Sequence, residues 1–238
     1  MRRSEISAVA IEKMVNEQVR AWEMKKKQKK EASRPIITIS RQFGTGSGEI
    51  VKALAKEMGL NIYNSSIIDE VAKSSRMSAN VIASLDEKGR SMLDDWLSIL
   101  EKHRNIWAYE YLEHLTKVIG TIAEHGNCII IGRGANYLLP HRGVLKVRII
   151  APIKMRVRNI MKKENISEED AKRKLIMVDS ERKAFTRQYF NTDIDDPIDY
   201  DLVINTGYLS IEKAAKIIKD ACGEEDERIE RDKISVVS

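Results

Sequence analysis

The sequence has few of the residues and patterns on which several classes of protein depend. Its 238 residues include only two cysteines, Cys128 and Cys222, and no Cys-x-x-Cys pair, which argues against a disulfide framework and a structural zinc site. Its apolar runs fall far short of the roughly 18 residues that a membrane-spanning helix needs. The N-terminal segment also lacks the apolar core of a signal peptide. We therefore expect a soluble protein of the reducing cytoplasm.

Positive charge is concentrated at one end of the chain. Lys and Arg number 41 against 36 Asp and Glu, a net charge of +5, which by itself suggests a nucleic-acid partner. However, residues 1–34 hold ten basic and five acidic side chains, so the rest of the chain is formally neutral. The basic run at 25–30 lacks interleaved aromatic residues. We favour a solvated helix end there, and contact with nucleic acid or anionic lipid is the weaker interpretation.

The same N-terminal segment has the pattern of a helical arm. Residues 4–32 contain no Gly or Pro, and Ile11, Val15, Val19 and Trp22 recur at helical spacing. This apolar stripe is too narrow for an independent domain. It should therefore lie on the body of the protein or on another subunit, and the second option would give a homo-oligomer through this helix.

Beyond the arm, short apolar runs alternate with helical patterns. The runs are continuous in apolar residues, which is typical of strands buried on both faces of a parallel sheet. The pattern therefore predicts a doubly wound α/β domain whose site lies at the carboxyl ends of the strands. The expected strands are 36–40, 60–63, 128–131, 144–150 and 202–205, and the principal expected helices are 49–58, 106–125, 153–163, 168–190 and 210–222.

A glycine-rich loop between the first strand and the next helix predicts a phosphate-binding site. Such a loop can wrap its amides around an anion at the positive end of the helix. It departs from the Walker A pattern, because Ser47 stands in the position of the lysine and Glu49 places a carboxylate beside the loop. Arg41 and Lys52 are the local cations that could replace the lysine. The loop residues expected to bind phosphate are Gly44, Thr45, Gly46, Ser47 and Gly48.

Three blocks of sequence, 37–50, 129–139 and 179–205, resemble the cytidylate kinase-like family, a branch of the P-loop nucleoside monophosphate kinases. The resemblance covers about residues 36–221. It implies a three-layer fold with a five-stranded parallel sheet of order 2-3-1-4-5 and helices on both faces. The expected organisation is a basic helical arm at 1–34, a kinase-like domain at 35–222 with an acceptor-binding region at about 64–126 and lid-like helices at about 153–190, and a charged tail at 223–238.

The resemblance also assigns roles to individual residues. Arg133 matches the family's arginine that holds the acceptor's phosphate, and Ser65 matches a residue of the acceptor site. Arg182 matches the family's lid arginine, and Arg187 follows on the same helix. The pair Asp69-Glu70 stands where the family has Tyr-Arg, which argues against cytidine specificity. The other cations of this region are interpreted mostly as solvated helix faces: Arg156, Arg158, Lys162, Lys163, Arg173 and Lys174.

Two functions follow as hypotheses. The leading one is transfer of the γ-phosphoryl group from ATP or another triphosphate to a nucleoside monophosphate or other small acceptor, with Mg²⁺ held mainly by phosphates and water because protein ligands are not evident. The alternative is a catalytically inactive nucleotide-binding module for regulation or assembly. Loss of the loop lysine and hydroxyl favours the alternative, whereas retention of Arg133 and Arg182 favours the enzyme.

Overall fold

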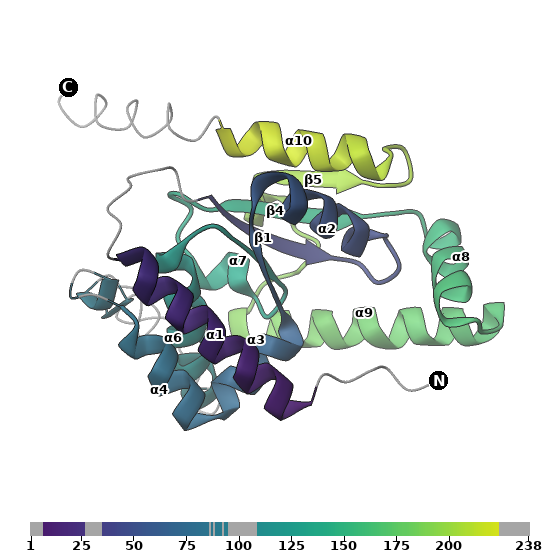
Figure 1. The fold of residues 1–238 in the computed structure, drawn as a ribbon. Coiled ribbons are helices and arrows are strands. Elements are labelled where there is room, and N and C mark those ends of the chain that lie inside the picture. Colours follow the sequence, from purple (N-terminus) through teal and green to yellow (C-terminus); the bar gives the residue numbers. More distant parts are fainter. Residues whose placement is uncertain are drawn as a thin grey trace, which may run out of the picture.

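The centre of the protein is a parallel β-sheet (Figure 1). A computed structural model describes residues 7–26, 35–85, 87, 89–91, 93–94 and 109–223. The strands are β1 (Ile36–Arg41), β2 (Asn61–Asn64), β3 (Cys128–Ile131), β4 (Leu145–Ile150) and β5 (Leu202–Asn205). Their order is β2-β3-β1-β4-β5, and each neighbouring pair is parallel. The expected fold class and strand order are therefore confirmed.

Helices cover both faces of this sheet. On one face α2 (Ser47–Met58) lies against α10 (Ile211–Gly223), and both pack on the apolar side chains of β1 and β4 (Figure 1). The opposite face carries the helical region that follows β2, and a hairpin of two helices follows β4. These helices are α3 (Ser65–Lys73), α4 (Ser75–Ala83), α6 (Tyr109–His125), α7 (Ala135–Leu138), α8 (Ile153–Glu164) and α9 (Glu168–Phe190).

The register of the sheet brings three strand ends together. Ile131 at the end of β3 pairs with Ile39 in β1 and with Asn64 at the end of β2. Ile37 and Ile39 are buried in the core beneath α2, and Thr38 and Ser40 alternate with them along β1. The residues that follow the three strands consequently share one edge of the sheet, which is where ligands bind in open α/β folds.

The N-terminal helix α1 (Ala8–Lys26) lies on the body of its own chain. It contacts α3 and α4, and its stripe of Ile11, Val15 and Trp22 belongs to the same core as α6. The indole of Trp22 stacks on His125 with 3.9 Å between ring centroids, and Nε2 of His125 lies 2.7 Å from Oγ of Ser84. The side chains of the basic run at 25–30 and the tail beyond 223 lie outside the described residues. An oligomer through this helix stays a prediction.

Trp22 should be the main anchor of α1. Trp22→Ala is expected to cost about 3 kcal/mol of packing free energy at this contact, the usual loss for a buried tryptophan. The measurement is hydrogen exchange along residues 8–26, which should become much faster as α1 detaches. Met24→Ala is the matched control, since Met24 is 71% exposed on the same helix. Equal protection of α1 in the two variants would contradict this anchoring role.

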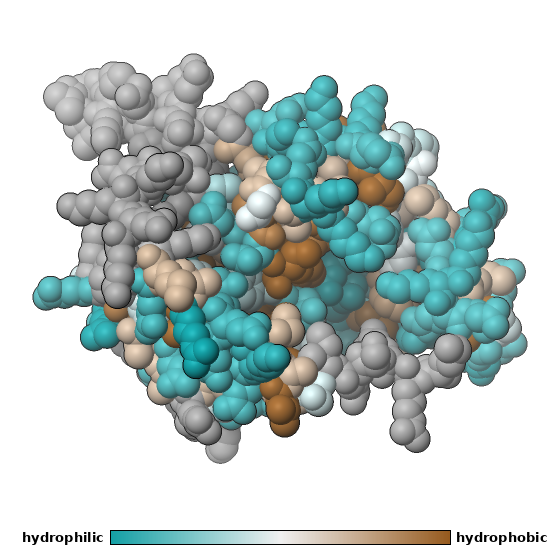
Figure 2. Space-filling model, viewed as in Figure 1, coloured by the Kyte–Doolittle hydropathy of each residue, from teal (hydrophilic) through white to brown (hydrophobic). Residues whose placement is uncertain are grey.

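The face in Figure 2 is mostly hydrophilic and is hollowed near its centre. Within the described ranges, no helix has the length and apolar character needed to cross a membrane.

Candidate functional site

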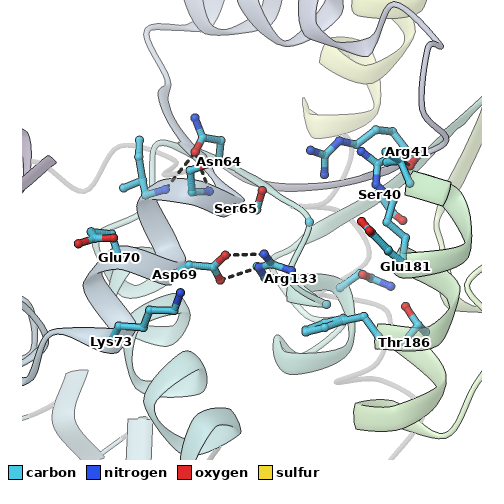
Figure 3. Close-up of a pocket in the computed structure, with 18 of the residues that line it drawn as sticks. Ser40, Arg41, Asn64, Ser65, Asp69, Glu70, Lys73, Arg133, Glu181 and Thr186 are labelled. Carbon is cyan, nitrogen blue, oxygen red and sulfur yellow. Dashed lines mark hydrogen bonds and ion pairs between the residues drawn. The ribbon is translucent and has the colours of Figure 1, made fainter. Parts of the chain in front are cut away.

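A pocket of about 1140 Å³ opens at the shared strand edge. Its lining residues come from the start of α1, the ends of β1 and β2, one side of α3, the turn after β3 with α7, the C-terminal half of α9, and the loop after α9. Figure 3 shows the α3 side chains on one side, Arg41 on the other, and Arg133 between them. Four of the predicted site residues line this pocket: Arg41, Ser65, Arg133 and Arg182.

Arg41 brings a positive charge to the pocket. Burial is the main cause that lowers the pKa of its guanidinium to about 9, and the positive charges of Arg182, Arg133 and Arg148 contribute to the same shift. No carboxylate among the described residues forms an ion pair with it. A Cβ on Gly132 would lie 2.6 Å from Nη1 of Arg41 and would displace the guanidinium from this position, and the φ of 78° at Gly132 also favours glycine. An anion bound at Arg41 would supply the missing charge.

Arg133 is held by an acidic partner. Its Nε donates to Oδ1 of Asp69 at 2.6 Å and its Nη2 donates to Oδ2, which makes a two-point ion pair (Figure 3). The hydroxyl of Tyr111 donates to Oδ1 of the same carboxylate at 3.0 Å. The guanidinium carbon of Arg133 also lies 5.3 Å from the ring centroid of Phe185. Arg133 therefore reaches the pocket with its orientation fixed and its charge paired.

Two residues of α9 hold the start of the glycine-rich loop. Asp179 accepts a hydrogen bond from the amide of Phe43 at 2.8 Å, and its other oxygen lies 2.5 Å from Nη1 of Arg156 in α8. Arg182 donates from Nη1 to the carbonyl of Arg41 at 2.8 Å. Arg156 is buried and is therefore an exception among the cations of this region that were expected to be mostly solvated. Asp179 and Arg182 tie the lid-like helices to the backbone between β1 and α2.

The glycine-rich loop has the backbone of an anion-binding turn. Gly44 and Gly46 have φ of 84° and 77°, in the left-handed region that favours glycine. A Cβ on Gly44 would lie 2.7 Å from the carbonyl oxygen of Arg156. Gly46 is the N-cap of α2, so the amides of Ser47 and Gly48 open the helix without intrahelical acceptors. Thr45 is buried, and its hydroxyl donates to the carbonyl of Gln42 at 3.2 Å rather than facing a ligand.

The remaining predicted residues do not line the pocket. The loop residues 44–48 lie beyond its edge, on the α2 side of Arg41. Lys52 is exposed and pairs with Glu49 at 3.2 Å. The carboxylate that Glu49 places beside the loop is therefore turned toward a cation. Arg187 is exposed on α9 outside the pocket.

Comparison with known proteins settles the family. The model of the cytidylate kinase-like family matches residues 36–208, most of the chain. The chain belongs to the cytidylate kinase-like family. It is 30% identical over 190 residues to the cytidylate kinase of Methanocaldococcus jannaschii, covering 78% of this chain and 96% of that protein. The cytidylate kinase of Pyrococcus horikoshii is 29% identical over 187 residues, covering 78% and 87%.

A solved structure supports the fold. The crystal structure of an uncharacterized protein from Eubacterium ventriosum superposes with a TM-score of 0.64 at 22% identity and covers 80% of this chain and 98% of its own. The α1 segment lies outside the part of the chain that the cytidylate kinase-like model matches.

The residues of this cytidylate kinase-like site fit a phosphate-bearing substrate. The uncompensated Arg41, the left-handed glycines and the opening amides of α2 all favour an anion at the end of β1. In the described part of the chain, no group of three or more His, Cys, Asp and Glu side chains could hold a metal ion. A magnesium ion bound together with a triphosphate would be coordinated in part by the phosphates and by water.

Sequence reasoning missed a buried network behind the pocket. Arg148 in β4 is 4% exposed, donates to Oγ of Ser40 at 2.8 Å and pairs with Asp195 at 2.6 Å. Asp195 also pairs with Lys183 at 2.5 Å. The sequence did contain a signal for this network, because Arg148 stands inside an apolar strand. A charge buried in this way needs a partner.

Proposed function

We propose that this member of the cytidylate kinase-like family transfers the γ-phosphoryl group of a nucleoside triphosphate to a small acceptor bound between α3 and α9. The observation that carries the proposal is Arg41 at the junction of the glycine-rich loop and the acceptor pocket, a cation with which no carboxylate in the described part of the chain forms an ion pair. Phosphoryl transfer depends mostly on positioning and charge neutralisation, which is what such a cation supplies.

Each part of the site has a distinct role in this proposal. The amides at the start of α2 bind the donor's phosphates, and Arg41 takes the place of the Walker A lysine. Arg182 holds the backbone carbonyl of Arg41, so it keeps the end of β1 in position and adds positive charge beside it. Ser65 and Arg133 face the acceptor. Magnesium, when bound with the triphosphate, would neutralise charge that develops on the phosphates.

The test is a titration followed by an assay. ATP and GTP with Mg²⁺ are titrated by calorimetry, and phosphoryl transfer is then measured with the four nucleoside monophosphates and their nucleosides. We expect triphosphate binding in about the micromolar to millimolar range and turnover with at least one acceptor. Binding without any turnover would contradict the kinase proposal and favour the inactive module. Absence of triphosphate binding would contradict both.

A further inference from the structure

The acceptor pocket has two electrostatically different sides. On the β1 side, Arg41 forms no ion pair with any carboxylate of the residues that the structure describes. On the α3 side, both oxygens of Asp69 are bound to Arg133, which neutralises the arginine that faces the pocket. One side of the pocket therefore favours an anion, and the other does not.

A phosphate at Arg133 would lie beside a carboxylate. The ion pair uses Nε and one Nη of the guanidinium, so a phosphate could reach only the remaining N–H groups. From there it would be repelled by Asp69, and like charges held this close cancel much of the attraction of the cation. Lys73, at the end of α3, also lines the pocket, but it is exposed and hydrated, which makes it a weak substitute.

The same side offers groups that bind hydroxyls. Asp69 receives two donors from Arg133 and one from Tyr111, and a carboxylate has about four acceptor positions, so one is left. Oδ1 of Asn64 already caps α3 through the amides of Ser66 and Ile67. Its amide NH₂ group and the hydroxyl of Ser65 lie at the pocket as further polar groups. This combination of acceptor and donor groups suits a sugar or polyol.

From this asymmetry we infer that the acceptor is a hydroxyl-bearing molecule without a phosphate at the α3 side, and that Asp69 is the residue that discriminates against the phosphorylated form. The inference rests on the proposed function and deepens it. In the reaction, the acceptor's hydroxyl oxygen forms a bond to the γ-phosphorus and the bond from that phosphorus to the bridging oxygen breaks. The nucleoside diphosphate keeps the electron pair, and the hydroxyl proton passes to water.

The experiment compares acceptors that differ only in a phosphate. The probes are cytidine and CMP, ribose and ribose 5-phosphate, and glycerol and glycerol 3-phosphate, titrated into the full chain with a non-hydrolysable ATP analogue. In at least one pair the wild type should bind the unphosphorylated member at least as tightly as its partner. Asp69→Asn keeps the size of the side chain and removes its charge. It should shift the ratio of the two dissociation constants in that pair by about tenfold toward the phosphorylated member, the size of effect expected for one close charge.

A matched variant separates Asp69 from net charge. Glu70→Gln removes the same charge one residue away on α3, where Glu70 also lines the pocket, so an effect of net charge alone would shift the ratio equally in both variants. An equal shift would overturn the inference. The inference would also be overturned if the wild type prefers the phosphorylated member of every pair, or if Asp69→Asn leaves the ratio unchanged in all pairs. Absence of binding by every probe would overturn it as well. Titration of ATP alone tests the proposed function separately.

Discussion

Arg41→Ala should stabilise the ligand-free protein and remove most of its affinity for ATP. The wild type holds a guanidinium among three other cations, so its removal is expected to raise the free energy of unfolding by about 1 kcal/mol. A hydrogen bond to a charged group contributes about 1.5–3 kcal/mol, so ATP affinity should fall roughly 10- to 100-fold. Thermal unfolding with and without ATP measures both effects, because a ligand raises the melting temperature only if it binds the folded state.

A control variant and the pH dependence of stability test whether these effects come from the charge of Arg41. Lys56→Ala removes one positive charge from an exposed position on α2 and should leave ATP affinity close to that of the wild type. Because the folded-state pKa of Arg41 is about 9 against an ordinary 12.5, the unfolded chain binds the proton more tightly. The stability deficit of the wild type relative to Arg41→Ala should then be constant below about pH 9 and shrink above it. Wild-type ATP affinity in Arg41→Ala would refute the assignment of Arg41 as the donor cation.

Asp179→Ala should be among the most destabilising single changes in the α8–α9 region. It removes the acceptor of the Phe43 amide and the partner of Arg156, whose side chain is 6% exposed. Breaking a buried ion pair on one side costs about 3–5 kcal/mol, because it leaves an uncompensated charge. Urea unfolding should show this loss as a lower midpoint. ATP affinity should fall as well, since the glycine-rich loop loses its tie to α9.

A double variant tests the cause of this loss. If the unpaired Arg156 accounts for most of the cost, then Arg156→Met combined with Asp179→Ala should recover part of the stability. Glu168→Ala is the control on the same helix, because Glu168 pairs with Lys172 at an exposed position and should change the midpoint far less. A double variant no more stable than Asp179→Ala would show that the lost Phe43 hydrogen bond, not the unpaired charge, dominates.

The strands and most of the long helices could be predicted because their signals are local. Apolar runs marked the strands, and the helices observed at Ile153–Glu164, Glu168–Phe190 and Ile211–Gly223 begin and end within about a residue of the patterns that indicated them. The strand order came from the resemblance to a known family, and the pairing of the strands confirms it. The helical arm also formed as its stripe predicted.

The partners of the charged residues could not be predicted in this way. Arg133 and Asp69 are 64 positions apart, and Phe43 and Asp179 are 136 apart, so only the folded chain brings them together. Among the basic residues of α8, nothing local distinguishes the buried Arg156 from exposed neighbours such as Arg158. The sequence identified which cations matched the family. It did not reveal that Asp69 neutralises the charge of Arg133, or that no carboxylate of the described residues does the same for Arg41.

The packing of α1 matters for any shortened form of the protein. A chain trimmed to the family match at 36–208 would lose both α1 and α10. The first loss would uncover the apolar groove that receives Ile11, Val15 and Trp22, and large exposed apolar patches promote aggregation. It would also remove Ser7, Ala8 and Ile11 from the wall of the acceptor pocket. Poor solubility or altered acceptor preference of such a fragment would then reflect truncation and not the chemistry of the intact site.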